Sequence, residues 1–450
     1  MVKYYLESLG CPKNLVDAHG MARLLKHLGH QPVADPDQAD VLLVNTCGFV
    51  EDARQESLEE LALLADGKRR DQVLVAAGCL AQLWGESLRE AVPGVDALIG
   101  TRRWDEIGPF MDALDEGQRP VLLGDSLRTA QGIGPRVARQ GTSAYLKIAE
   151  GCSAPCAFCA IPTIKGRAAS RPRDAVVGDA ADLVAEGVKE IILIAQDTTA
   201  YGRDRGERDA LPELIEAILD VATRSASGGE VHGEGLRWLR LMYAYPAHIS
   251  ARLIDMMAND PRVCHYLDLP LQHAHPAVLR RMRRPADVER TQRLIADLRA
   301  AMPDVALRTS FIVGYPGETE AEFEALLDFV AEMRFDRVGA FLYSPETGTP
   351  AAELPGRVPA EVQEERYERL MALQQGISLE INHSQIGRTL DVLVEGTGDG
   401  LSVGRSYRDA PEIDGMVLIP GEVAPGSLVR ARITDAMEYD LVGQLARDGG

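Results

Sequence analysis

The sequence predicts an α/β protein of three domains: a parallel α/β domain, a partial (β/α)6 barrel and a small carboxy-terminal β-barrel. Three observations lead to this prediction: β-rich runs alternate with helical patterns in the first third, six more strand candidates follow Ser143, and short β-like runs between Gly, Asp and Pro turns end the chain. A length of 450 residues fits about three domains. We expect the domains at residues 1–125, 138–378 and 380–447.

The amino-terminal domain is predicted from apolar runs typical of buried parallel strands, with the amphipathic stretch Ala53 to Ala65 among the helices between them. The expected strands are Lys3 to Leu9, Val41 to Asn45 and Val73 to Ala77. The pattern fades near Asp125 into Ser126 to Gly141, a segment with few large apolar residues that reads as a linker or loose hairpin.

The middle domain has six βα units and lacks the G-x-G-x-x-G motif of a dinucleotide fold, which favours an open or partial barrel with its chemistry at the carboxyl ends of the strands. Its expected strands are Tyr145 to Ile148, Glu190 to Ala195, Leu236 to Met242, Tyr266 to Leu269, Ala306 to Val313 and Val338 to Tyr343. The hydrophilic stretches Arg203 to Asp209 and Arg224 to Gly235 are interpreted as solvated loops.

A helix after Pro359 is expected to lead away from the barrel, with an apolar face formed by Leu370, Leu373, Ile377 and Ile381. The last domain starts near Gln385. Its expected strands are Thr389 to Val394, Met416 to Ile419 and Leu428 to Ile433, the pattern of a small closed or half-closed β-barrel.

Composition narrows the class. The formal charge of −20 disfavours nonspecific capture by nucleic acid or anionic membrane unless basic residues cluster locally. No apolar run approaches the roughly 18 residues of a membrane span, and the amino terminus has no signal-peptide core, so we expect a cytoplasmic protein. In a reducing compartment the spacing of the seven cysteines indicates metal or redox chemistry.

Cys152, Cys156 and Cys159 form a C-x3-C-x2-C loop directly after the first expected barrel strand. Three thiolates within eight residues can ligate three irons of one cubane cluster and leave the fourth iron open to a small molecule. Zinc is the alternative, but a structural zinc site needs four ligands, and the loop holds neither a fourth Cys nor a His.

Cys11, Cys47 and Cys79 form a second set, because each follows an expected strand by one to a few residues. In a parallel sheet all three would lie at the same carboxyl edge, where ligands collect, and they suggest a second cluster with an open site. A glycine beside each cysteine suits close backbone approach. The alternative is three buried cysteines that pack as small hydrophobes.

The loop resembles the signature of the radical S-adenosylmethionine (SAM) superfamily, in which the open iron takes the amino and carboxylate groups of SAM. The resemblance implies SAM contacts from Phe158 and from the turn Gly314-Tyr315-Pro316-Gly317-Glu318, chiefly Gly314, Gly317 and Glu318. Where the superfamily has Gly-Gly-Glu after the second strand, this chain has Ala195-Gln196-Asp197-Thr198, so Gln196 is the candidate there.

Two triads and a terminal β-barrel resemble the methylthiotransferase family, which combines an amino-terminal domain, a radical SAM barrel and an OB-like TRAM domain. The branch that modifies a loop aspartate of small-subunit ribosomal protein twelve is the most similar, on the segments Ser8 to Asn14, Ile148 to Cys152, Ala195 to Thr199, Val403 to Tyr407 and Asp409 to Gly415. The chain departs from that branch at Ala18 and His19, where Ser and Glu are usual.

The resemblance implies two 4Fe-4S clusters and SAM as cofactors. Sulfur insertion at an aspartate β-carbon requires breaking an unactivated C–H bond, beyond the 10²- to 10⁴-fold that a general base supplies. In the family, the barrel cluster reduces SAM to give a 5′-deoxyadenosyl radical, and the second cluster holds the sulfur, accepts a methyl group and transfers methylthio. An electron donor and a sulfur donor are further expected partners.

Other polar residues at strand ends are weaker candidates. Asp197 and Arg308 are candidate substrate contacts, with Arg308 expected to meet the target carboxylate. Tyr243, Asp268 and the turn Gln272-His273-Ala274-His275 are expected to line the barrel mouth, without a metal role for the histidines. Arg280, Arg281, Arg283 and Arg284 read as a solvated helix face, and Cys264 as structural.

Two alternatives share some of these features: a tRNA methylthiotransferase, and a noncatalytic Fe-S adaptor that binds RNA. From Gln385 to Gly450 there are six Arg and no Lys against eleven Asp and Glu, and only two aromatic residues, Tyr407 and Tyr439. Because nucleic-acid affinity rests on cations and stacking, direct nucleic-acid binding is disfavoured. We expect the acidic residues Asp409, Glu412 and Asp414 to help dock a basic protein substrate.

Overall fold

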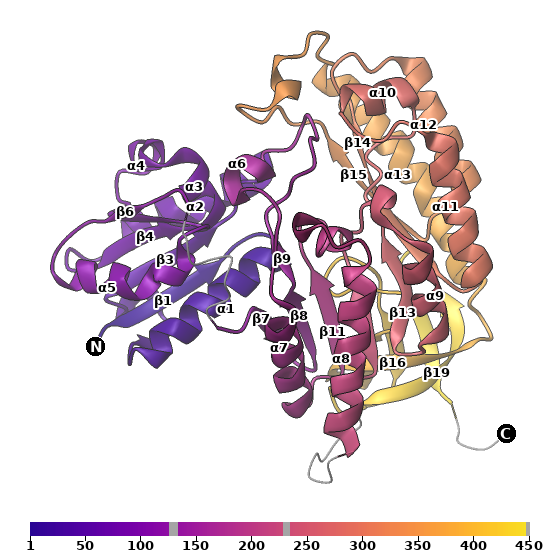
Figure 1. The fold of residues 1–450 in the computed structure, drawn as a ribbon, viewed down its shortest axis with the longest axis horizontal. Helices are drawn as coiled ribbons and strands as arrows, with labels where there is room; N and C mark the ends of the chain where they lie inside the picture. The colour runs from indigo at the N-terminus through magenta and orange to yellow at the C-terminus, as the bar shows by residue number, and fades with distance from the viewer. Residues whose placement is uncertain (126–133, 228–234, 447–450) are drawn as a thin grey trace.

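The computed structural model describes residues 1–125, 134–227 and 235–446. Two parallel sheets and a closed β-barrel make up the molecule (Figure 1). The predicted class, an amino-terminal parallel α/β domain, a partial six-stranded barrel and a small terminal β-barrel, is confirmed.

The amino-terminal sheet has the strand order β2-β1-β3-β4-β5-β6, all parallel. Its strands β3 and β4 are buried throughout because helices cover both faces, α1 and α5 on one and α2, α3 and α4 on the other. The strands are β1 (Lys3–Ser8), β2 (Gln31–Pro32), β3 (Val41–Thr46), β4 (Val73–Ala77), β5 (Ala97–Gly100) and β6 (Val121–Leu122), and the helices are α1 (Pro12–His27), α2 (Glu51–Gly67), α3 (Gly78–Trp84), α4 (Glu86–Ala91) and α5 (Ile107–Asp115).

The central sheet has the order β15-β14-β13-β12-β11-β8-β7, in which six parallel strands are joined by an antiparallel edge strand, β7. It curves as an open half-barrel with its helices outside (Figure 1). Its strands are β7 (Val137–Gln140), β8 (Ser143–Lys147), β11 (Glu190–Ile194), β12 (Trp238–Leu241), β13 (Val263–Asp268), β14 (Ala306–Val313) and β15 (Arg337–Leu342), and a separate short pair is β9 (Ala149–Glu150) with β10 (Ala169–Ser170). The helices are α6 (Ile161–Lys165), α7 (Arg173–Ala185), α8 (Ala210–Ser227), α9 (Ala251–Asn259), α10 (Pro276–Arg281), α11 (Val288–Ala301) and α12 (Glu320–Met333).

Two sequence expectations need correction here. The long helix α13 (Ala360–His383) does not lead away from the sheet: Leu370 and Ile377 are buried in the same core as the strands. The stretch from Arg224 is not all loop, because α8 continues to Ser227. The stretch read as a linker or loose hairpin supplies β7, which pairs antiparallel with β8 in a hairpin, while residues 126–133 and 228–234 lie outside the described part.

The terminal domain is a closed five-stranded barrel with the order β16-β17-β18-β20-β19. Alternating residues of its strands, among them Val392, Ile419 and Ile433, fill a small apolar core. The sequence pattern found three of the five strands and missed two short ones. The strands are β16 (Thr389–Gly398), β17 (Leu401–Arg405), β18 (Val417–Pro420), β19 (Leu428–Ala436) and β20 (Leu441–Leu445).

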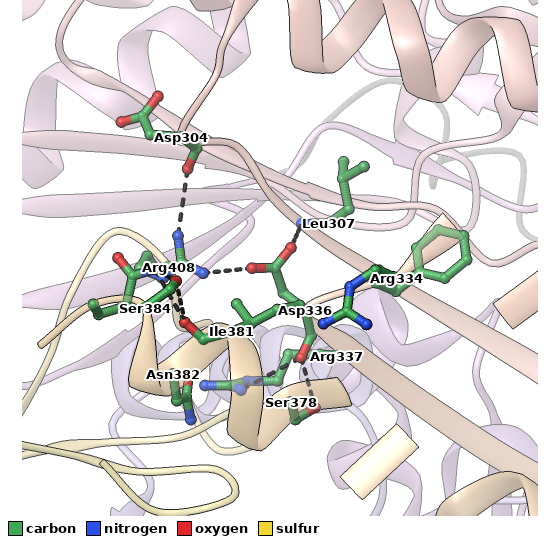
Figure 2. Close-up of polar contacts among 12 residues, drawn as sticks. Asp304, Leu307, Arg334, Asp336, Arg337, Ser378, Ile381, Asn382, Ser384 and Arg408 are labelled. Carbon is green, nitrogen blue, oxygen red and sulfur yellow. Dashed lines mark hydrogen bonds and ion pairs between the residues drawn. The ribbon is translucent and has the colours of Figure 1, made fainter. Parts of the chain in front are cut away.

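The segment after β17 joins this barrel to the central sheet through buried charges, with partners on or next to β11, β12 and β15. Arg408 pairs with Asp336, whose second oxygen accepts a hydrogen bond of 2.9 Å from the Leu307 amide (Figure 2). Arg405 and Arg240 both pair with Glu190, at 2.6 and 2.7 Å. The terminal barrel therefore closes the end of the half-barrel opposite the carboxyl ends of its strands.

The docking role expected for the acidic residues of this segment is wrong for two of the three. Asp409 is buried and pairs with Arg337 at 3.0 Å. The side chain of Asp414 is buried and accepts a hydrogen bond of 2.6 Å from the Tyr266 hydroxyl. Only Glu412 is exposed, where it accepts from Gln140.

Candidate functional site

Cys11, Cys47 and Cys79 follow the adjacent parallel strands β1, β3 and β4 and meet at one edge of the sheet. Their loops touch. A Cβ built on Gly10, which has φ +89°, would lie 2.6 Å from the Cβ of Cys47, and one on Gly48 would lie 2.9 Å from the Leu80 Cα beside Cys79. Glycine is required at these two positions by the close contact of the loops with one another.

Asn14 holds the three loops together. Its Nδ2 donates to the carbonyls of Leu9, Asn45 and Thr46 at 2.7 to 3.2 Å, and its Oδ1 lies 3.9 Å from the Cys79 sulfur. Burial raises the pKa of the Cys47 thiol, and raises that of Cys79 to about 12. Iron binding would have to offset the free-energy cost of forming a thiolate at these buried positions.

The second triad lies in the loop between β9 and α6. This loop is fixed by backbone hydrogen bonds from Cys152 N to Gly166 O, 3.0 Å, and from Ala157 N to Met282 O, 2.9 Å. Burial raises the pKa of the Cys152 thiol, and that of Cys159 to about 12. All three cysteines are half-buried.

Arg284 is a residue of this site that sequence reasoning missed. Its Nη1 lies 3.6 Å from the Cys156 sulfur, its Nη2 donates to Pro270 O at 2.7 Å, and its guanidinium covers the Tyr245 ring at 4.6 Å. Arg281 likewise pairs with Glu322, at 2.8 Å. The interpretation of this arginine cluster as a solvated face is therefore wrong for these two residues, although Arg280 is exposed.

The two triads are neighbours. Cys79 packs in one apolar cluster with Ala160, the residue after Cys159, and with Ile164 of α6. This contact places the loop of the amino-terminal triad against the loop of the barrel triad. The sequence predicts each triad on its own but does not bring them together.

The donor sets suit iron–sulfur clusters. Each site offers three thiols without a competing histidine or carboxylate in the cysteine loop, and cubane clusters take their cysteine ligands at separate irons. Among the described residues, no three His, Cys, Asp or Glu side chains are arranged to hold a single metal ion. The residues that would hold the clusters are Cys152, Cys156 and Cys159 in the barrel and Cys11, Cys47 and Cys79 in the amino-terminal domain.

The residues expected to contact SAM lie around the barrel triad. Phe158 packs against a cluster that includes Tyr315 and Tyr343. Gln196 Nε2 lies 3.4 Å from Glu150, and its Oε1 is buried without a partner among the described residues. The SAM contact of each remains a prediction.

The glycine-rich turn has φ values of +73° at Gly314 and +72° at Gly317. Glu318 is buried within this turn, where it accepts hydrogen bonds from the Gly314 and Tyr315 amides and pairs with Arg366 at 2.8 Å. Its carboxylate is engaged within the chain, so any SAM contact here falls to the glycine backbone.

Both proposed substrate contacts have partners of their own. Asp197 accepts hydrogen bonds from Thr199, 2.7 Å, and lies 2.8 Å from His248 Nδ1. Arg308 pairs with Asp268 at 2.9 Å and with Asp414 at 3.4 Å. The expectation that Arg308 presents a free cation to the substrate is therefore not supported by its surroundings.

The remaining candidates are placed as follows. Cys264 is buried in an apolar cluster of the central sheet, and burial raises the pKa of its thiol to about 12. His273 is buried 3.5 Å from Glu318, and His275 caps α10 through the Ala277 amide. These contacts agree with a structural role for Cys264 and for both histidines.

Comparison with protein families agrees with this architecture. Residues 3–100 match the uncharacterized protein family UPF0004, residues 146–330 the radical SAM superfamily, and residues 386–446 the TRAM domain. A radical SAM methyltransferase from Kitasatospora setae, TsrM, has the same fold over 84% of this chain and 89% of its own, with a TM-score of 0.57 and 14% identity. Fold and cysteine triads thus define a radical SAM enzyme of the methylthiotransferase type.

Curated relatives identify the branch. A ribosomal protein uS12 methylthiotransferase RimO from Roseiflexus sp. is 49% identical over 99% of this chain and 97% of its own, and one from Chloroflexus aurantiacus is 50% identical over 98% and 99%. The chain belongs to the RimO family of radical SAM methylthiotransferases. No helix in the described part is long and apolar enough to span a membrane.

Proposed function

We propose that this protein inserts a methylthio group at the β-carbon of an aspartate in small-subunit ribosomal protein twelve, uS12. Relatives that match nearly the whole chain at 44 to 50% identity are named ribosomal protein uS12 methylthiotransferase RimO. The observation that carries the proposal is the contact of Cys79 with Ala160, because it joins the two triads into one site. One site can then serve both the radical and the sulfur step.

When bound, the two 4Fe-4S clusters and SAM supply an electron, a radical that abstracts hydrogen from carbon, and a methylated sulfur. The chain itself supplies position. The aromatic cluster around Phe158 excludes water beside the barrel triad. Arg284 places a positive charge against Cys156, and Asn14 fixes the amino-terminal loops.

The acidic surface supports a protein substrate over tRNA. Ribosomal proteins are basic because they neutralise RNA, so a chain of charge −20 attracts uS12 and repels a polynucleotide. The proposal places the reaction in the cytoplasm. It also requires an external electron donor and an external sulfur donor, and it assigns no direct nucleic-acid binding to the terminal barrel.

In the test, the reconstituted enzyme is incubated with uS12 and, in a parallel reaction, with tRNA. Both reactions contain SAM, a sulfide source and a chemical reductant. We expect the methylthio mass increase on the uS12 aspartate alone. The variant Cys264→Ala, which keeps both triads, serves as the matched cysteine control and should retain the activity. Modification of tRNA with none on uS12 would assign the protein to the rival class.

A further inference from the structure

Lys13 lies two residues after Cys11, in the first turn of α1, and its ammonium faces the half-barrel. Its Nζ lies over the ring of Tyr243, 2.9 Å from the ring centroid. Within the described residues no ion pair joins the Lys13 ammonium to a carboxylate, and the Tyr243 ring is its aromatic contact. An ammonium that lies over an aromatic ring and has no carboxylate partner is suited to bind an anion.

Neighbouring cations differ from Lys13 in this respect. Arg308 is held by Asp268 and Asp414. Lys147 and Lys165 both pair with Asp17, at 2.5 and 2.8 Å. Of these four cations, Lys13 alone is left without a carboxylate of its own.

Tyr243 is held in a strained conformation that fixes its ring beneath Lys13. Its φ is +60°, in the left-handed region that a bulky residue rarely adopts. The strain is maintained from both sides, because the Tyr243 amide donates to Asp268 at 3.1 Å and its carbonyl accepts from the Thr198 amide at 3.0 Å. Strain retained in this way clusters at ligand-binding positions.

We propose that Lys13 binds the carboxylate of the target aspartate, with the Tyr243 ring as its support. This inference rests on the proposed function and names the residue that selects an acidic side chain. A carboxylate on Lys13 lies beside the Cys11 loop, so the adjacent β-carbon is presented to the amino-terminal triad. Lys13 then does what the sequence pattern assigned to Arg308.

The test is a double-mutant cycle on the reconstituted holoenzyme. Two labelled peptides of the uS12 loop, one with the target Asp and one with Asn in its place, are bound to wild type, Lys13→Met and Lys13→Arg, and the dissociation constants are measured by fluorescence anisotropy. Lys26→Met, at the exposed end of the same helix, is the matched control. Iron content and SAM cleavage without peptide are recorded for each protein.

We expect Lys13→Met to bind the Asp peptide about 10- to 100-fold more weakly, the loss typical of one charged hydrogen bond. The same variant should bind the Asn peptide as wild type does, and Lys13→Arg should keep most of the preference for Asp. Equal weakening of both peptides, or no preference for Asp in wild type, would overturn the inference. If wild type modifies uS12 but the effect of Lys13→Met is the same for the Asp and Asn peptides, only the role of Lys13 is refuted. If wild type fails to modify uS12, the proposed function itself is refuted.

Discussion

Lys165 Nζ lies 2.8 Å from Asp17 Oδ2, and this buried ion pair connects the segments that follow the two cysteine triads. Asp17 is six residues after Cys11 in α1, and Lys165 is six residues after Cys159 at the end of α6. Asp17 also pairs with Lys147. One carboxylate that pairs with two ammonium groups therefore helps to fix the relative position of the two triads.

Replacing Asp17 with Asn should loosen this interface. Removing one partner of a buried ion pair leaves uncompensated charge and typically costs about 3–5 kcal/mol. We expect a lower melting temperature and faster cleavage between the amino-terminal domain and the barrel in limited proteolysis. Asp112→Asn, on the exposed side of α5, is the control and should behave as wild type. Unchanged melting of Asp17→Asn would show that the pair does not hold the domains.

Each triad should hold its own cluster. Anaerobically reconstituted protein is expected to bind about eight irons per chain. Alanine at Cys152, Cys156 and Cys159 should remove about half the iron and abolish SAM cleavage, while alanine at Cys11, Cys47 and Cys79 should remove the other half and leave SAM cleavage measurable. Retention of all the iron in the second variant contradicts the amino-terminal site.

Arg284 should raise the reduction potential of the barrel cluster. A guanidinium beside a ligand sulfur stabilises the more negative, reduced cluster. We expect Arg284→Gln to shift the midpoint potential to more negative values, with Arg284→Lys between it and wild type. The shift is measured by EPR-monitored redox titration in protein that lacks the amino-terminal cysteines. Arg280→Gln, exposed near the end of the preceding helix α10, should leave the potential unchanged, and an unchanged potential in Arg284→Gln would refute this role.

The ion pairs of Glu190 should make the docking of the terminal barrel sensitive to acid. Burial alone would raise the pKa of Glu190, but Arg405 and Arg240 lower it to about 2. The glutamate carboxyl of an unfolded chain has a pKa of about 4.3. The ion pairs of Glu190 therefore stabilise the fold fully above that pH, and this stabilisation is lost as the pH falls toward 2.

Glu190→Gln should therefore melt well below wild type at pH 7, and the difference should narrow as the pH is lowered from 5 toward about 3. Differential scanning calorimetry across this range provides the measurement. Glu422→Gln, on the exposed surface of the terminal barrel, should have the same melting temperature as wild type at every pH. A difference between Glu190→Gln and wild type that stays constant with pH would contradict the assignment.

The strands and the cysteine triads were predictable because their signals are local. Val41 to Asn45 and Ala306 to Val313 are apolar runs of strand length, and Cys152 to Cys159 carries its chemistry within eight residues. Even the convergence of Cys11, Cys47 and Cys79 follows from strand direction in a parallel sheet. Such inferences need only the spacing of residues along the chain.

The pairing of charges was not predictable in the same way. Arg308 and Asp414 are far apart in sequence, and only the docked terminal barrel brings them together. Arg284 looks like one of four surface arginines until the turn after α10 is placed against the cysteine loop. These roles depend on contacts between residues far apart in the chain, and such contacts produce no periodic pattern in the sequence.

The most direct test is mass spectrometry of uS12 from a strain that lacks this protein, beside the same strain complemented with wild type or with alanine at Cys11, Cys47 and Cys79. The account predicts that the target aspartate loses its methylthio mass in the deletion strain and regains it with wild type only. Methylthiolated uS12 that persists in the deletion strain would contradict the account.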